Sequence, residues 1–129
     1  LAVAFADLGQ TREALQAWED AIARDSDNPT WHFRYAKLLS AAGSGDMAEA
    51  HLRRAIDLVE EARKAAPASK PKLPVWLWQA HYLLARELGQ VPAAVQHWQA
   101  FLRLSPPDDP YRAEAQRALV SLGQPWEPR

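Results

Sequence analysis

Four histidines, His32, His51, His81 and His97, are the residues of this chain best suited to metal binding or proton transfer. Zinc sites on helices usually carry two histidines four residues apart, as in H-E-x-x-H, and no two of these lie within ten residues of each other. His81 and His97 could approach each other if their segments formed the two helices of one hairpin. Packed or surface histidine is the simpler interpretation, so we assign no metal-binding residue.

Other polar groups offer little catalytic chemistry. The run Asp25-Ser26-Asp27-Asn28 has carboxylates two residues apart, but it lacks the glycine and the distal glutamate of a calcium loop, and helix capping explains it better. The sequence has no G-x-S-x-G and no phosphate-binding glycine loop. Carboxylates such as Glu60-Glu61 stand beside Arg63-Lys64, as expected of a solvated helix surface. We therefore expect no catalytic residue, no cofactor and no enzyme activity.

The amino-acid composition excludes several further classes of protein. The chain has 129 residues, 48% of them apolar, which is enough to form a core. Fifteen Lys and Arg against sixteen Asp and Glu give a net charge of −1, which argues against a nucleic-acid partner. The sequence has no cysteine, so disulfides, cysteine zinc sites and thiol nucleophiles are excluded. No apolar run approaches the roughly 18 residues of a membrane span, so we expect no membrane insertion.

Recurring glycines indicate how the elements are organised. Gly9 and Gly43 are 34 residues apart, as are Gly89 and Gly123, whereas Gly43 and Gly89 are 46 apart. The twelve additional residues are found at 64–75, which read KAAPASKPKLPV and have the proline content of a loop. A repeat of fixed length indicates that one structural unit recurs along the chain.

The residues that follow each glycine also recur. Alanine stands five residues on, a large apolar residue nine residues on and an aliphatic residue thirteen residues on: Ala14, Ala48 and Ala94; Trp18, Leu52 and Trp98; Ile22, Ile56 and Leu102. On a helix these positions form one apolar stripe, and the small residues let a neighbouring helix come close. The pattern predicts antiparallel helix pairs closed by a turn at glycine.

This register resembles the tetratricopeptide repeat (TPR) family. The residues that carry the resemblance are Leu1-Ala2-x2-Phe5, Gly9 and Ala14-x3-Trp18-x2-Ala21, and the segment from Trp78 to Pro106 is similar. The resemblance implies an all-α fold, a right-handed α-solenoid of antiparallel helix hairpins. It would have about three to four repeats, one of them with an extended second helix and a Pro-rich insertion.

The expected organisation is a single TPR-like helical domain over residues 1–129. The repeat boundaries fall near 1–28, 29–66, 75–108 and 109–129, with the insertion at about 64–75. Helices are expected at about 1–8, 11–25, 29–42, 46–65, 74–88, 91–104 and 109–122. Because the chain starts part-way through a repeat and without methionine, we interpret it as a piece of a longer protein.

For function, the resemblance implies a non-catalytic interaction module or scaffold that binds a protein or peptide partner in a concave groove. The partner-binding positions that it assigns are Phe33, Lys37, Trp76, Gln79, Leu83, Arg86 and Arg117. Such a groove mixes aromatic area with scattered cations and suits an extended or helical peptide of some acidic character. The alternative at these positions is that the cations only keep the surface soluble.

A second hypothesis is structural. The helices would then pack against the rest of a larger protein or a twin copy of the chain, as a homo-oligomer. The end of the sequence is similar to bacterial repeat proteins of envelope, cytochrome-maturation and motility systems, and this gives an assembly or oligomerisation segment as the alternative function. The compartment, bacterial cytoplasm or periplasm, is not assigned by the sequence.

Overall fold

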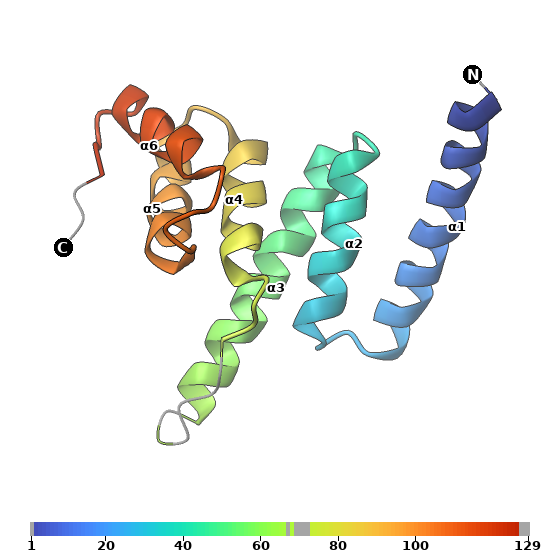
Figure 1. The fold of residues 1–129 in the computed structure, drawn as a ribbon. Coiled ribbons are helices and arrows are strands. Elements are labelled where there is room, and N and C mark those ends of the chain that lie inside the picture. Colours follow the sequence, from blue (N-terminus) through green and yellow to red (C-terminus); the bar gives the residue numbers. More distant parts are fainter. Residues whose placement is uncertain (1, 67, 69–72, 127–129) are drawn as a thin grey trace. The chain divides into compact units, whose positions relative to one another are not determined.

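The computed structural model describes residues 2–66, 68 and 73–126, with side chains from residue 11 onward (Figure 1). Within these residues the chain forms six α-helices and no strand. The helices are α1 (Ala2–Arg24), α2 (Pro29–Ala41), α3 (Gly45–Ala65), α4 (Leu77–Leu88), α5 (Val95–Leu104) and α6 (Arg112–Ser121), with a 3-10 turn, η2 (Pro92–Ala94), before α5. The all-α prediction is confirmed.

The chain divides into two compact units, Leu1–Pro71 with α1 to α3 and Lys72–Arg129 with α4 to α6. The division lies inside the predicted insertion at 64–75, of which residues 67 and 69–72 lie outside the described part of the chain. The single domain and its repeat boundaries stay predictions of the sequence. Each unit is described below by itself.

Three of the four predicted turn glycines end a helix in the conformation that favours glycine. The backbone φ angles are +85° at Gly43, +79° at Gly89 and +76° at Gly123. A residue that has a Cβ rarely adopts a positive φ, because the Cβ then lies too close to the carbonyl oxygen that follows it. These residues therefore turn the chain after α2, α4 and α6, as the register predicts.

The prediction of a turn at Gly9 is wrong. Helix α1 runs without interruption from Ala2 to Arg24 and includes Gly9. The physical reason why the helix continues through Gly9 lies in the residues that follow each glycine in the sequence. Gly43 is followed two residues on by a second glycine, and Gly89 and Gly123 are each followed within three residues by proline. Gly9 has no second helix breaker after it, and a lone glycine costs a helix only about 1 kcal/mol.

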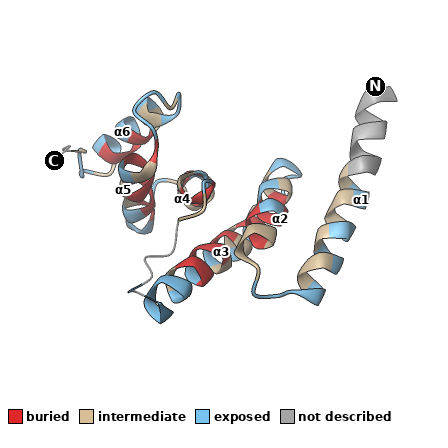
Figure 2. Cartoon of the chain, turned by 60° about the horizontal axis from the view of Figure 1, so that its bottom comes forward, coloured by how far each residue is buried: buried red, intermediate tan, exposed pale blue. Residues whose placement is uncertain are grey.

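In the first unit, α2 and α3 form an antiparallel hairpin against which α1 packs. Helix α2 begins at Pro29, and the side chain of Asn28 accepts a hydrogen bond from the backbone N–H of Trp31 at 3.3 Å. The Asp25–Asn28 run is therefore a helix cap. The core comprises the buried residues Tyr35, Leu39 and Ala48, with Leu15, Trp18 and Ile22 of α1 packed against them. Figure 2 shows the buried faces of α2 and α3 turned toward each other.

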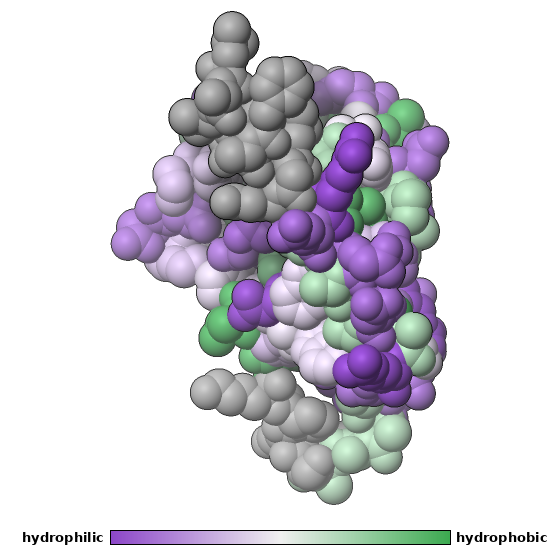
Figure 3. Space-filling model, turned by 90° about the vertical axis from the view of Figure 1, so that its right-hand side faces the viewer, coloured by the Kyte–Doolittle hydropathy of each residue, from purple (hydrophilic) through white to green (hydrophobic). Residues whose placement is uncertain are grey.

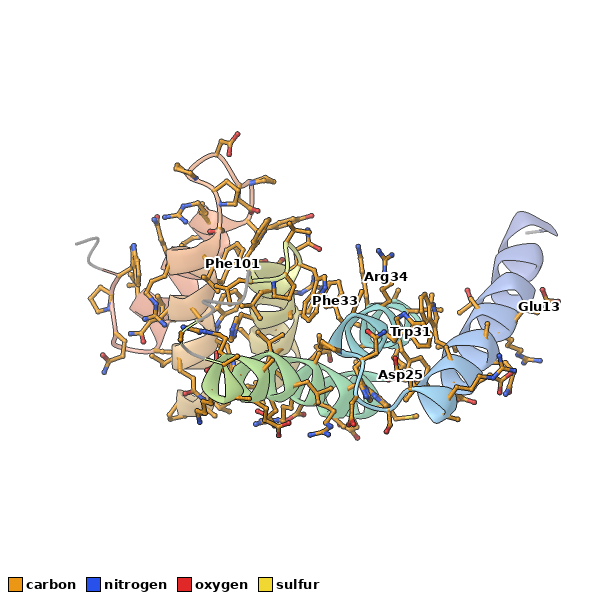
Figure 4. The ribbon with its side chains drawn as sticks, turned by 90° about the horizontal axis from the view of Figure 1, so that it is seen from below. Glu13, Asp25, Trp31, Phe33, Arg34 and Phe101 are labelled. Carbon is orange, nitrogen blue, oxygen red and sulfur yellow. The ribbon has the colours of Figure 1, made fainter. Side chains whose placement is uncertain are left out.

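Helix α1 has a less buried inner face than the other two helices of its unit. None of its described side chains is fully buried, and they are coloured as intermediate or exposed in Figure 2. Its Trp18 meets Trp31 of α2 edge to face, with ring centroids 6.4 Å apart, and Trp31 is labelled between these helices in Figure 4. The connection of α1 to the hairpin therefore depends on a few large side chains.

The second unit repeats the hairpin in α4 and α5 and adds α6. Its core includes Tyr82, Trp98 and Phe101. Phe101, which is labelled in Figure 4, is only 1% exposed. The apolar positions of the glycine register are buried in both hairpins: Ala48 and Ala94, Leu52 and Trp98, Ala55 and Phe101, Ile56 and Leu102. The two hairpins thus place equivalent residues in equivalent packing positions, as the sequence predicts.

Candidate functional site

A cleft of about 330 Å³ opens in the second unit where α4, α5 and α6 meet. Its lining is mixed in polarity and consists of Ala85, Arg86, Gly89, Gln90, Trp98, Glu114, Arg117, Ala118 and Ser121. Small residues leave the space open, and the turn at Gly89 exposes the backbone beside it. Two arginines against one glutamate give the lining an excess of positive charge.

Two polar atoms in this lining have no hydrogen-bond partner. They are Nε1 of Trp98 and Oε2 of Glu114, and both are inaccessible to solvent. A buried donor or acceptor that makes no hydrogen bond costs about 1–3 kcal/mol. Trp98 and Glu114, which line the cleft, therefore each have one buried polar atom without a hydrogen bond in the described chain.

Tyr82 connects the cleft to the core of the second unit. Its hydroxyl hydrogen-bonds Glu114, and burial together with this carboxylate raises the pKa of Tyr82 to about 12. The guanidinium of Arg86 lies over the same ring, with its central carbon 5.5 Å from the ring centroid. Tyr82 thus positions two residues of the cleft: its hydroxyl binds Glu114, and its ring contacts Arg86.

Two predicted partner-binding residues meet in this cleft. Arg86 comes from α4 and Arg117 from α6, and both side chains are exposed. Of the other predicted residues of α4, Gln79 is exposed, whereas Leu83 is half-buried and packs against the core of the unit. Sequence reasoning did not include Glu114, although it lies one helical turn before Arg117 and shares its side of α6.

The remaining predicted residues lie elsewhere. Lys37 of α2 is exposed, whereas Phe33 of the same helix is only 5% exposed. Trp76, which directly precedes α4, is 9% exposed. Little of either aromatic side chain is accessible. The assignment of these three residues to partner binding stays a prediction.

A second hollow, of about 470 Å³, runs along α6. It is lined by Ala113, Gln116, Arg117, Val120 and Ser121. Arg117 therefore lines both hollows, and Val120 is 63% exposed beside it. On the face that Figure 3 shows, most of the surface is hydrophilic.

The histidines form two pairs. His81 and His97 meet across the α4–α5 hairpin with their Nδ1 atoms 3.0 Å apart, which confirms that these residues approach each other. His32 and His51 meet in the same way across α2 and α3, also at 3.0 Å, and sequence reasoning missed this pair. The available signal was that His51 and His97 both stand eight residues after a turn glycine. No group of three or more metal-ligating side chains occurs among the described residues.

Comparison with known families identifies the first unit. Residues 1–63 match a family model described as Tetratricopeptide repeat. The match covers just under half of the chain, so this segment is similar to the tetratricopeptide repeat family, and the described residues form an all-α, TPR-like helical repeat. The family is one of protein-interaction scaffolds.

Two other findings bear on the class. Comparison with curated proteins gives no match. None of the helices in the described part of the chain is long and apolar enough to cross a membrane.

Proposed function

We propose that this chain is a non-catalytic interaction module that binds a segment of a partner protein at the cleft of α4, α5 and α6. The observation that carries the proposal is the convergence of Arg86 and Arg117, from two different helices, on one cleft. The similarity of residues 1–63 to a family of interaction scaffolds supports the same function.

The lining favours an acidic, peptide-like partner. Arg86 and Arg117 carry planar guanidinium groups that match carboxylates, against a single carboxylate from Glu114. A peptide also offers backbone groups to the side chains of Gln90 and Ser121. Exposed charges mainly set the rate and the specificity of such an encounter, so binding should weaken with added salt.

Titration of the full chain with sets of peptides tests this function. Peptides of equal length carrying acidic, neutral or basic side chains are titrated while tryptophan fluorescence is recorded, because Trp98 lines the cleft. Acidic peptides should bind tightest. The double variant R86E/R117E should lose that preference, whereas R63E, which alters an exposed cation of α3, should retain it. Equal binding of all three classes, or an unchanged double variant, would refute the proposal.

Self-association is the alternative function, and the exposed Val120 on α6 favours it. Light scattering of the full chain distinguishes the two. A monomer that binds acidic peptides supports partner recruitment. A dimer that dissociates on V120E supports assembly through α6.

A further inference from the structure

Each hairpin of this protein contains one histidine pair, with one imidazole from each of its two helices. In the first pair the rings of His32 and His51 are stacked, with centroids 5.2 Å apart and planes 24° from parallel. In the second pair His81 and His97 have the same centroid separation and an angle of 30°. The Nδ1 atoms are 3.0 Å apart in both pairs. The same contact therefore occurs twice in one chain, in two separate units.

The surroundings of His32 determine the protonation of the first pair. Its Nε2 lies 2.7 Å from the backbone carbonyl oxygen of Ser26. A carbonyl oxygen only accepts, so Nε2 of His32 carries a proton, and in the neutral ring Nδ1 is then bare. The hydrogen bond between the rings must therefore be donated by Nδ1–H of His51. This leaves Nε2 of His51 as the bare, basic nitrogen.

A pair arranged in this way tolerates one added proton but not two. The first proton can bind Nε2 of His51 and leave the Nδ1–H···Nδ1 hydrogen bond intact. A second proton must bind Nδ1 of His32, which is the acceptor. Two N–H groups would then face each other across 3.0 Å on two charged rings. In the second pair one Nδ1 must likewise be protonated and the other bare, although the donor is not assigned.

We propose that the two histidine pairs are proton-sensitive clasps, each holding the helices of its hairpin together while at least one of its imidazoles is neutral and releasing them when both are charged. The helices are neighbours in the chain, so release loosens packing within each unit.

Neighbouring groups make the second clasp the more acid-sensitive one. Burial, His97 and Arg103 of α5 all lower the pKa of His81, from 6.5 to about 4. In the first pair, burial and His32 lower the pKa of His51, but Glu19 of α1 opposes them. Tyr35 also packs edge to face on His51, at 4.7 Å between centroids, and its hydroxyl is hydrogen-bonded to that same Glu19.

The direction of the pH effect follows from linkage. The unfolded chain takes up a proton at His81 near pH 6.5, whereas the folded chain resists protonation until about pH 4. The contribution of the second pair to stability is therefore complete above pH 6.5 and is lost as the pH falls toward 4. The α4–α5 hairpin should loosen first.

NMR of the imidazole nitrogens in the unaltered full chain tests the clasp directly. At pH 8, His32 should be the Nε2–H tautomer and His51 the Nδ1–H tautomer, and His81 and His97 should differ from each other. On acidification from pH 6.5 to 4, the protection factors of the amides, which correct for the pH dependence of intrinsic exchange, should fall in α4–α5 before they fall in α2–α3. An Nε2–H tautomer at His51, or four rings that titrate independently near pH 6.5, would overturn the proposal.

Variants provide a second measurement with a built-in control. The pair H81F/H97F fills both sites with rings that do not titrate. It should abolish the acid-induced fall of the amide protection factors in α4–α5 while leaving that in α2–α3 unchanged. The matched pair H32F/H51F should do the reverse. Acid sensitivity that persists in the altered hairpin of either variant would show that other groups cause it. If either variant fails to fold, the tautomers of the unaltered chain decide the question.

Discussion

The hydroxyl of Tyr35 in α2 donates a hydrogen bond to Oε1 of Glu19 in α1, across 2.8 Å. None of the described side chains of α1 is fully buried. Tyr35 itself is only 3% exposed and belongs to the core of the first unit. This hydrogen bond therefore attaches an incompletely packed helix to a well-packed hairpin.

Removing the hydroxyl should loosen that attachment. We expect Y35F to lower the free energy of unfolding by about 1 kcal/mol, as for a typical hydrogen bond, since the ring still fills its site. E19Q and the double variant complete a thermodynamic cycle in urea. A coupling energy close to zero would mean that the two side chains contribute independently, and α1 would then be held by its apolar contacts alone.

The same tyrosine should make the protein sensitive to alkali. Burial and Glu19 raise the pKa of Tyr35 from 10.0 to about 12, so the unfolded chain loses this proton before the folded chain does. Its contribution to stability is complete below pH 10 and is lost as the pH rises toward 12. Tyr82, whose pKa is also raised to about 12, should act in the same window. Chemical denaturation at pH 9 and pH 11 should show a smaller loss for Y35F than for the unaltered chain.

Replacing glycine by alanine should lower stability at a turn of positive φ and raise it inside a helix. G43A places a Cβ at φ +85°, where no neighbouring atom lies within 4 Å, so only backbone strain is added, and stability should fall by about 1 kcal/mol. G9A removes a glycine from inside α1 and should raise stability by up to about 1 kcal/mol. Thermal unfolding of both variants measures this difference. A destabilised G9A would indicate a turn rather than a helix at that residue.

These glycines also show how far the sequence predicts the fold. The spacing of apolar residues and the turn glycines predicted both hairpins. This was possible because a buried position requires an apolar residue and a position of positive φ favours glycine, so both can be recognised from residue type. Gly9 has the same spacing as the others, but whether a lone glycine ends a helix depends on the residues after it. The meeting of His32 with His51 was indicated only by the register of His51, because the place of His32 depends on how far one helix is shifted along the other. The cleft was not predictable, since Glu114 and Arg86 are brought together by the packing of α6.

Overpacking should distinguish buried from exposed alanines on α3. Ala48 is fully buried against the hairpin core, so A48L should cost about 1–3 kcal/mol as the added carbons displace its neighbours. A62L makes the same change at an exposed position near the end of the same helix and should have little effect. Urea denaturation compares the two. Equal costs would indicate that the close contact at Ala48 is not required for packing.

Arg112 is a half-buried side chain that should stabilise the second unit, because it binds polar groups at the carboxyl end of α5. Its Nη1 donates to the carbonyl oxygen of Leu102 and to Oγ of Ser105, at 2.7 Å each. The last carbonyls of a helix lack partners within the helix and carry partial negative charge, which a guanidinium neutralises. We expect R112M, which keeps much of the apolar stem, to cost about 1.5–3 kcal/mol, the range for hydrogen bonds to a charged group.

The matched control is R63M on α3. Arg63 makes a solvent-exposed ion pair with Glu60 at 3.1 Å, a contact that contributes at most about 1 kcal/mol. Amide exchange reports where the loss occurs, and in R112M it should accelerate at the end of α5 and the start of α6 while the first unit keeps its protection. If R112M and R63M were equally stable, the carbonyls at the end of α5 would be satisfied by water, and the packing of Ala115 and Leu119 alone would hold α6 on α5.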